Sequence, residues 1–241
     1  MGSLGSEGQL VMLFYLICDV SASMEPELDA LHDEIVELRN AIAGDPVLDG
    51  AAQVCVMTFG DKATVHVELM QMSDLPEDEI PAFDCEVHTL YGEAFREVAY
   101  RIKRDYMALK LDRYQVHHRP CVYFLTDGEP SDRDWRTTLE QTLSETAMAD
   151  MNVPSFYPVV VPFGYRNAMT QTMSRLAYPP GGSRWYHTRD TTPDVALVGI
   201  LDIITRSMRA STLSVRTGQP ELVLPDPERG SGIDSGFAEY Y

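Results

Sequence analysis

Three oxygen-bearing side chains stand close together near the start of the sequence, directly after a long apolar stretch. Asp19, Ser21 and Ser23 occupy alternate positions where the run QLVMLFYLIC ends. Asp127 ends a second apolar run, and Thr89 precedes a long helical pattern. Small hydroxyl and carboxylate side chains pack poorly in a core, whereas hard divalent cations bind oxygen ligands. The set therefore predicts a cation site, provided that the fold brings its members together.

The elements that would position these residues alternate between buried strands and amphipathic helices. Continuous apolar runs suit strands covered on both faces, and apolar residues every three to four positions suit helices. Residues 62–72 alternate instead, which is typical of an edge strand with one wetter face. We expect strands at residues 9–18, 51–60, 62–72, 119–128, 153–164 and 183–188, and helices at 24–45, 89–111, 132–150, 167–177 and 192–212.

This order of elements predicts an α/β fold. We expect a Rossmann-like, doubly wound, mostly parallel central sheet with one antiparallel edge strand and helices on both faces. In such sheets, ligands bind beyond the carboxyl ends of the strands, where the strand order reverses. Asp19 and Asp127 end two strands that are neighbours in a doubly wound order, so we expect them in one crevice with Ser21 and Ser23. Thr89 lies in a loop at the same edge. The expected ion is Mg²⁺, or else Mn²⁺, with Ca²⁺ less favoured.

The motifs DVSASM, the threonine of HTLYGEAF, and TDGEPSD, in this order, resemble the metal-ion-dependent adhesion site of von Willebrand factor A domains. The family pattern is Asp-x-Ser-x-Ser, then a distant Thr, then a distant Asp. The stretch VCVMTFGDKATV is also similar to that family, and the match covers residues 14–208. Within the family, the chain is most similar to small stand-alone bacterial members of the tellurium-resistance type. The complete set in order is a specific signal, whereas Asp-x-Ser-x-Ser alone would be weak.

The resemblance implies a role for each residue of the set. Ser21, Ser23 and Thr89 would coordinate the metal through their hydroxyls, and Asp19 and Asp127 would hold it mainly through bound waters. An Asp or Glu carboxylate of a protein partner often completes the metal shell in the family. Members similar to this chain are encoded beside a protein kinase and a metal-dependent phosphatase, so the resemblance also implies phosphosignalling partners.

One loop departs from the family pattern. Glycines usually precede the threonine, but Val87 and His88 stand there in this chain. The change either stiffens the loop or places His88 at the rim of the site. We assign Glu129, in the motif TDGEPSD, to the rim as well.

The charge balance excludes two classes of partner. The chain of 241 residues carries 37 acidic and 19 basic residues, which gives a net charge of -18. Nucleic acids and anionic membranes would be repelled, so we expect neither as a partner. The four cysteines form no Cys-x-x-Cys pair, no signal-peptide pattern opens the sequence, and no apolar stretch is long enough to span a bilayer. These features favour a cytoplasmic location.

Composition also divides the chain. We assign residues 9–212 to the von Willebrand factor A domain and residues 1–8 to a flexible N-terminus or a cloning remnant. Residues 213–241 are rich in Pro, Gly, Asp and Glu, which predicts a flexible acidic tail.

Three functions fit the metal-ligand set. The first is a binding module, in which the metal captures an acidic group of a partner. The second is a metal-dependent hydrolase or phosphatase, and the third is a structural subunit with an empty site. A phosphatase-type Asp-x-Asp would need a carboxylate at Ser21, and no glycine-rich phosphate loop or Ser-His-Asp set is present. We therefore expect a binding protein and not an enzyme. Helix caps and turns alone would explain each residue singly, but not the whole set.

Overall fold

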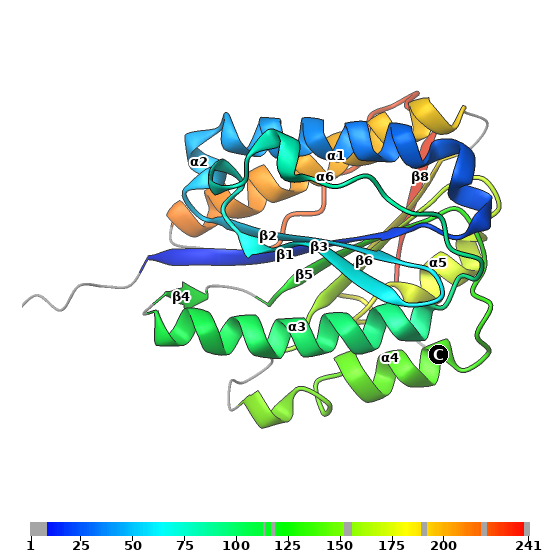
Figure 1. Cartoon of the computed structure of the whole chain (residues 1–241). Coiled ribbons are helices and arrows are strands. Elements are labelled where there is room, and N and C mark those ends of the chain that lie inside the picture. The colour runs from blue at the N-terminus through cyan, green and yellow to red at the C-terminus, as the bar shows by residue number, and fades with distance from the viewer. Residues whose placement is uncertain are drawn as a thin grey trace, which may run out of the picture.

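The long apolar stretches of the sequence form the strands of one central sheet. A computed structural model describes residues 9–112, 114–116, 119–151, 156–188, 192–217 and 221–238 of the chain. The sheet order is β3-β2-β1-β5-β6-β7-β8, and the short β4 pairs with the start of β1 (Figure 1). The strands are β1 (Leu10–Asp19), β2 (Ala52–Phe59), β3 (Ala63–Met70), β4 (Gln115–Val116), β5 (Cys121–Thr126), β6 (Val159–Gly164), β7 (Arg184–Thr188) and β8 (Ile233–Phe237).

The sheet is mixed and mostly parallel. The neighbours β2, β1, β5, β6 and β7 pair in parallel, whereas β3 pairs antiparallel with β2 and β8 pairs antiparallel with β7. The predicted fold class is therefore confirmed, including the antiparallel strand at the β3 edge. The second antiparallel edge strand, β8, was not predicted.

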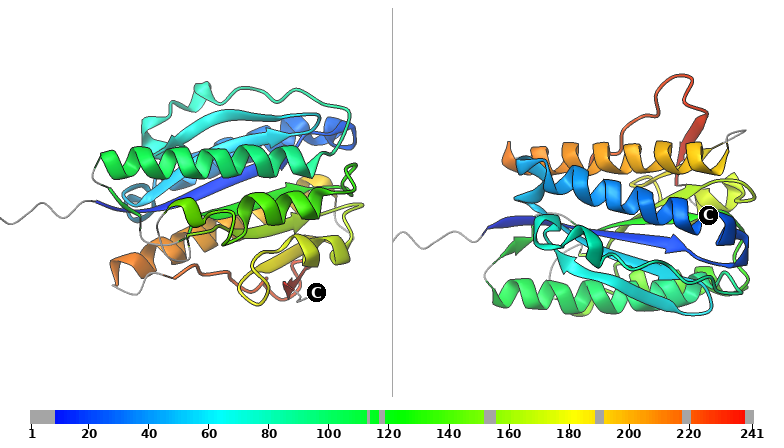
Figure 2. Two further views of the ribbon diagram at one scale, coloured as in Figure 1. Left: turned by 90° about the horizontal axis from the view of Figure 1, so that it is seen from below. Right: turned by 45° about the horizontal axis from the view of Figure 1, so that its top comes forward.

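Helices cover both faces of the sheet. Helices α1, α2 and α6 lie on one face, and α3, α4 and α5 lie on the other, with α1 beside α6 and α3 beside α4 (Figure 2). Within the described ranges, no helix combines the length and the apolar character needed to cross a membrane. The helices are α1 (Leu28–Ala43), α2 (Pro46–Asp49), α3 (Tyr91–Leu111), α4 (Trp135–Leu143), α5 (Thr170–Leu176) and α6 (Pro193–Arg216), with 3-10 turns at Ala22–Glu27, Met72–Asp74, Glu77–Glu79 and Ala149–Met151.

Helix α4 is shorter than the pattern of residues 132–150 predicts. It ends at Leu143 because Ser144 adopts an extended conformation, with φ of -68° and ψ of 163°. The Ser144 hydroxyl then accepts a hydrogen bond from the Ala147 backbone N–H at 3.2 Å, which begins a separate turn. A serine that satisfies a backbone donor in this way competes with a continuous helix.

The alternation of side chains along β1 divides the core into two layers. Met12, Phe14, Leu16 and Cys18 pack in the cluster that includes α1 and α6. The intervening residues pack in the cluster that includes α3, α4 and α5; they are Val11, Leu13, Tyr15 and Ile17. Both faces of this central strand are thus buried, which explains its unbroken apolar sequence. The one acidic residue of the strand, Asp19, stands at its carboxyl end.

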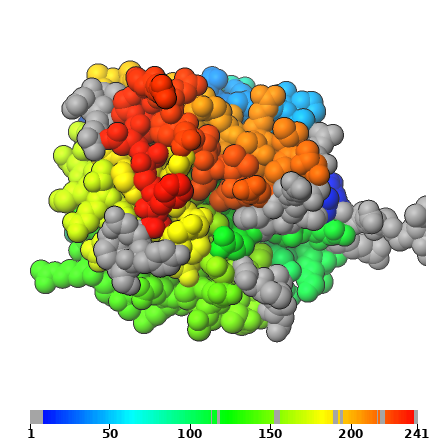
Figure 3. Space-filling model, turned by 180° about the vertical axis from the view of Figure 1, so that it is seen from behind, coloured from blue at the N-terminus to red at the C-terminus, as the bar shows by residue number. Residues whose placement is uncertain are grey.

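The C-terminal segment corrects the prediction of a flexible acidic tail at residues 213–241. Helix α6 continues to Arg216, and β8 pairs with β7 over five residue pairs from Arg184↔Phe237 to Thr188↔Ile233. Figure 3 shows this segment lying against the surface of the molecule beside α6. Tyr186 also donates a hydrogen bond to the Pro225 carbonyl at 2.8 Å. Residues 1–8, assigned to a flexible N-terminus, and residues 239–241 lie outside the described residues.

Candidate metal centre

The carboxyl ends of β1 and β5 place two aspartates at one edge of the sheet. The two strands pair in parallel with Cys18 opposite Leu125, so that Asp19 and Asp127 follow at adjacent strand ends. Strand β1 lies between β2 and β5, which is where the order of the sheet reverses. Both side chains are fully buried. The topology thus brings the two acids together across more than a hundred residues of sequence.

Hydrogen bonds join four members of the predicted set into one cluster. Asp19 accepts from the Ser21 backbone N–H at 2.8 Å and from the Thr126 hydroxyl at 2.6 Å. The hydroxyls of Ser21 and Ser23 lie 3.3 Å apart. Ser23 in turn donates to Asp127 Oδ1 at 2.8 Å. The series of hydrogen bonds from Asp19 through the two serines to Asp127 is therefore continuous.

Thr89 lies beside the loop that follows β5. Its backbone N–H donates to the Ser131 hydroxyl at 3.2 Å, and its carbonyl accepts from the Ser131 N–H at 2.9 Å. The threonine is buried, yet its own hydroxyl makes no hydrogen bond to any described residue. The structure records no direct contact between Thr89 and the two aspartates. Its hydroxyl is thus left available as a ligand from the neighbouring loop.

Asp61 holds the loop of Val87 and His88, which precedes Thr89. Its two carboxylate oxygens accept from the Val87 backbone N–H at 3.1 Å and contact His88 Nδ1 at 2.5 Å. The bond from His88 lowers the pKa of Asp61. On the other side, the Glu86 N–H donates to the Val20 carbonyl at 2.8 Å, which ties this loop to the end of β1. His88 is exposed and is paired with Asp61. The role of Asp61 was not predicted from the sequence.

Glu129, assigned to the rim, is engaged at the start of α5. Its Oε1 accepts from the Met169 backbone N–H at 2.9 Å, and its Oε2 accepts from the Thr172 hydroxyl at 2.5 Å. Both carboxylate oxygens therefore serve the first turn of this helix. In this position Glu129 links the loop after β5 to α5.

The guanidinium of Arg166 lies beside the cluster, and no sequence motif indicated it. Arg166 Nη1 donates to the Ser23 carbonyl at 3.0 Å and to Glu27 Oε2 at 2.8 Å. The same nitrogen lies 3.6 Å from Asp127 Oδ2. Arg166 is more than a hundred residues from Ser23 and Glu27, so only the folded chain reveals these contacts.

Burial makes both aspartates unusual acids. It raises the pKa of Asp19 to about 6, against hydrogen bonds from Ser21 and Thr126 that favour the ionised form. Burial also raises the pKa of Asp127, while the Ser23 hydrogen bond and Arg166 act in the opposite direction. A divalent cation would relieve this cost, because it supplies positive charge to both carboxylates.

The residues fit a hard divalent cation by their chemistry. Asp127 Oδ2 is buried and has no hydrogen-bond partner among the described residues, so that one strong acceptor is left unsatisfied. The donors that would hold the ion are the hydroxyls of Ser21, Ser23 and Thr89 and the carboxylates of Asp19 and Asp127. Carboxylate and hydroxyl oxygens suit Mg²⁺, Mn²⁺ or Ca²⁺. In the described part of the chain, no three or more His, Cys, Asp or Glu side chains gather as metal ligands, so the site depends on its hydroxyls.

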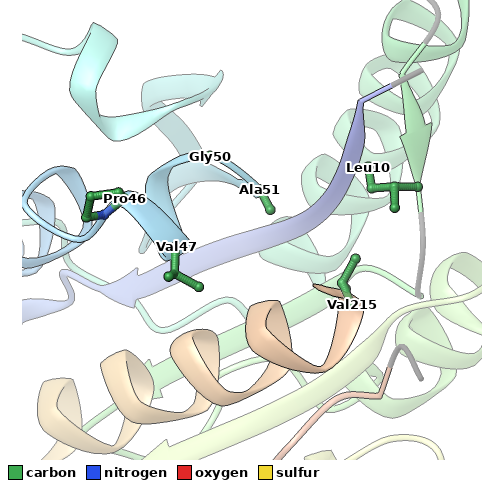
Figure 4. Close-up of a pocket in the computed structure, with 6 residues that line it drawn as sticks. All are labelled: Leu10, Pro46, Val47, Gly50, Ala51 and Val215. Carbon is green, nitrogen blue, oxygen red and sulfur yellow. The ribbon is translucent and has the colours of Figure 1, made fainter. Parts of the chain in front are cut away.

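An apolar pocket lies far from this cluster. It has a volume of about 300 Å³ and is lined by Leu10, Pro46, Val47, Gly50, Ala51 and Val215 (Figure 4). Leu10 begins β1, whereas Asp19 ends it, so the pocket and the metal centre lie at opposite ends of the same strand. The pocket therefore takes no part in the candidate centre.

Solved structures share this arrangement of strands and helices. A von Willebrand factor type A protein from Catenulispora acidiphila aligns with a TM-score of 0.51 and 13% identity, over 83% of this chain and 43% of that one. The chain has the fold of a von Willebrand factor type A domain. The pilus adhesin SpaC from Lactobacillus rhamnosus GG, in its open conformation, shares that fold with a TM-score of 0.58 and 13% identity, over 85% of this chain and 31% of that one.

A third structure with the type A fold carries a metal. Proximal thread matrix protein 1 from the mussel byssus, with a zinc-occupied MIDAS motif, aligns with a TM-score of 0.54 and 10% identity, over 84% of this chain and 48% of that one. Our chain thus spans less than half the length of each of these three proteins. No family model and no curated protein sequence matches this sequence. The likeness establishes the fold, and the argument for a metal rests on the side chains described above.

Proposed function

We propose that this protein is a metal-dependent protein-interaction module. Asp19, Ser21, Ser23, Thr89 and Asp127 would hold Mg²⁺ or Mn²⁺, and an Asp or Glu carboxylate of a partner protein would complete the shell. The observation that carries the proposal is the unsatisfied, buried Oδ2 of Asp127 at the end of a continuous hydrogen-bonded cluster. When bound, the ion supplies an electrophilic position that a carboxylate can occupy.

The chain's own residues shape that capture. The Thr126 hydroxyl and the Ser21 N–H fix the Asp19 carboxylate, so that its orientation is set before a ligand arrives. Ser23 is exposed at the surface while Asp19 and Asp127 lie below it, which orders the donors from the rim inward. Asp61 holds the loop before Thr89 through its bonds to Val87 and His88. A prearranged set of this kind loses little conformational freedom on binding.

We propose binding without catalysis. The two side chains that would serve as acid or base at the rim are both engaged, His88 with Asp61 and Glu129 with the first turn of α5. General acid–base catalysis needs a titratable group within hydrogen-bond reach of the reacting atoms. The expected outcome is no hydrolysis of nucleotides, phosphomonoesters or peptides above background. Turnover that disappears in Asp127→Ala would instead establish a metal-dependent hydrolase or phosphatase.

The biological setting is a further part of the proposal. We assign the protein to a bacterial stress or phosphosignalling system of the tellurium-resistance type, with a protein kinase and a metal-dependent phosphatase as partners, on the motif resemblance alone. A cytoplasmic location is supported by the four free thiols, of which Cys18, Cys55 and Cys121 are buried.

A pull-down from the native host tests the proposed function. Wild-type protein and Asp19→Ala are each used as bait, with Mg²⁺ and with EDTA. We expect a partner that is retained only by wild-type protein with metal. Capture that is equal in all four conditions would refute metal-dependent binding.

A further inference from the structure

Arg166 is held at the edge of the metal centre by its own backbone. The residue follows β6 and has a φ of 53°, which is a left-handed conformation that side chains with a Cβ rarely adopt. Hydrogen bonds fix the turn on both sides, from the Tyr165 N–H to the Thr126 carbonyl at 3.2 Å and from the Asn167 N–H to the Asp127 carbonyl at 2.9 Å. The turn that carries Arg166 is thus bonded to the strand end that carries Asp127.

The contacts of the guanidinium separate an anchor from a charge pair. Arg166 Nη1 carries two hydrogens, and its two hydrogen bonds go to the Ser23 carbonyl and to Glu27 Oε2. Asp127 Oδ2, at 3.6 Å from the same nitrogen, receives no hydrogen bond from it. Asp127 can therefore exchange its pairing with Arg166 for another cation without any loss of the anchor on Ser23 and Glu27.

Charge counting shows what Arg166 does for the site. Asp19, Glu27 and Asp127 are three buried carboxylates, and the guanidinium offsets one of their three negative charges when all are ionised. The remaining charge of -2 matches a divalent cation. Without Arg166, the cation would meet these carboxylates with no competing positive charge beside Asp127 and would bind more tightly. A buried carboxylate without a positive partner costs stability. Loss of Arg166 would therefore also lower the stability of the metal-free protein.

We propose that Arg166 is a built-in counter-cation of the metal centre, which stabilises the metal-free site and lowers its affinity for divalent cations. This inference rests on the proposed function, because it assigns a role toward the same metal. It makes Arg166 the residue that sets the metal concentration at which the module loads. The two effects have opposite signs in one variant, which a purely structural role for the side chain would not produce.

Three variants test the inference with Mn²⁺ as the probe. Arg166→Gln removes the charge, Arg166→Lys keeps it, and Arg133→Gln makes the same charge change at another exposed arginine. The dissociation constant for Mn²⁺ is measured by electron paramagnetic resonance of the free ion, and thermal melting is measured in EDTA. We expect Arg166→Gln to bind Mn²⁺ more tightly, on the order of tenfold, because a neighbouring positive charge is removed. In EDTA we expect it to melt a few degrees below Arg133→Gln, by roughly 2–4 °C.

The controls separate the possible failures. Arg166→Lys should keep the wild-type affinity for Mn²⁺, since the charge remains, and Arg133→Gln should keep it because that charge is screened by solvent. Affinity that is unchanged or weaker in Arg166→Gln would overturn the inference and leave Arg166 as a support for the Ser23 turn. A wild-type protein that binds no Mn²⁺ would overturn the proposed function as well.

Discussion

Replacement of Thr126 by valine should destabilise the protein through Asp19. The Thr126 hydroxyl donates to Asp19 Oδ2 at 2.6 Å, and both residues are fully buried. A hydrogen bond to a charged group contributes about 1.5–3 kcal/mol, and valine keeps the shape of threonine without the donor. For a domain of this size each kcal/mol shifts Tm by about 2–4 °C, so the expected loss is roughly 3–12 °C at pH 7 in EDTA.

Thr212→Val is the matched control. Thr212 lies in α6, is fully buried, and its hydroxyl has no hydrogen-bond partner in the described part of the chain. The same substitution there removes no hydrogen bond, so Tm should stay the same or rise. Both variants are melted by circular dichroism at pH 7 and pH 5. The loss in Thr126→Val should shrink at pH 5, where protonation of Asp19 removes its charge. Equal losses in Thr126→Val and Thr212→Val would refute the argument.

Three further predictions concern pH, the Thr89 loop and the second edge strand. The pKa of Asp19 in the folded protein, about 6, lies above its ordinary value of 3.8. The stability that the protonated Asp19 contributes to the metal-free protein is therefore lost as pH rises from 4 to 7. Thermal melting of wild-type protein and of Asp19→Asn across this range isolates the contribution. Asp61→Ala frees the Val87 N–H, so Mn²⁺ titration should show weaker binding with little change in metal-free Tm. Gly236→Ala would place a Cβ 2.5 Å from the Trp185 ring, and urea unfolding should show a loss of about 1–3 kcal/mol; unchanged stability would contradict the packing of β8.

Sequence patterns were sufficient for the centre of the sheet. The strands β1, β2 and β5 are buried on both faces, so their runs of apolar residues are long and unambiguous. The ends of β1 and β5 are equally clear, because an aspartate cannot continue such a run. The meeting of Asp19 with Asp127 followed from the rule that places ligands where the strand order reverses.

The second edge strand had no comparable signal. Strand β8 reads IDSGF, and none of its residues is fully buried. Its position depends on packing that only the fold supplies, with Gly236 against the Trp185 ring. From its sequence alone, a polar stretch of this kind resembles a flexible tail. In the folded protein it forms a strand because the edge of β7 offers it backbone pairing.

The surroundings of the metal centre were also hidden in the sequence. Asp61 and Arg166 stand in turns, where acidic and basic residues are common and usually solvated. Their partners lie in other loops, at Val87 and His88 for Asp61 and at Ser23 and Glu27 for Arg166. Contacts between loops have no periodicity, so composition and spacing cannot reveal them.

The central claim is that Ser21 and Ser23 are ligands of a divalent cation. Thermal melting of wild-type protein and of the double variant Ser21→Ala/Ser23→Ala, each with EDTA and with added Mg²⁺ or Mn²⁺, tests it most directly. At a metal concentration of 100 times Kd, binding to the folded state stabilises by about 2.7 kcal/mol, which is a rise in Tm of roughly 5–11 °C. The account predicts this rise for wild-type protein and none for the double variant, each compared with its own melting in EDTA. An equal rise in both proteins would contradict the assignment of the site.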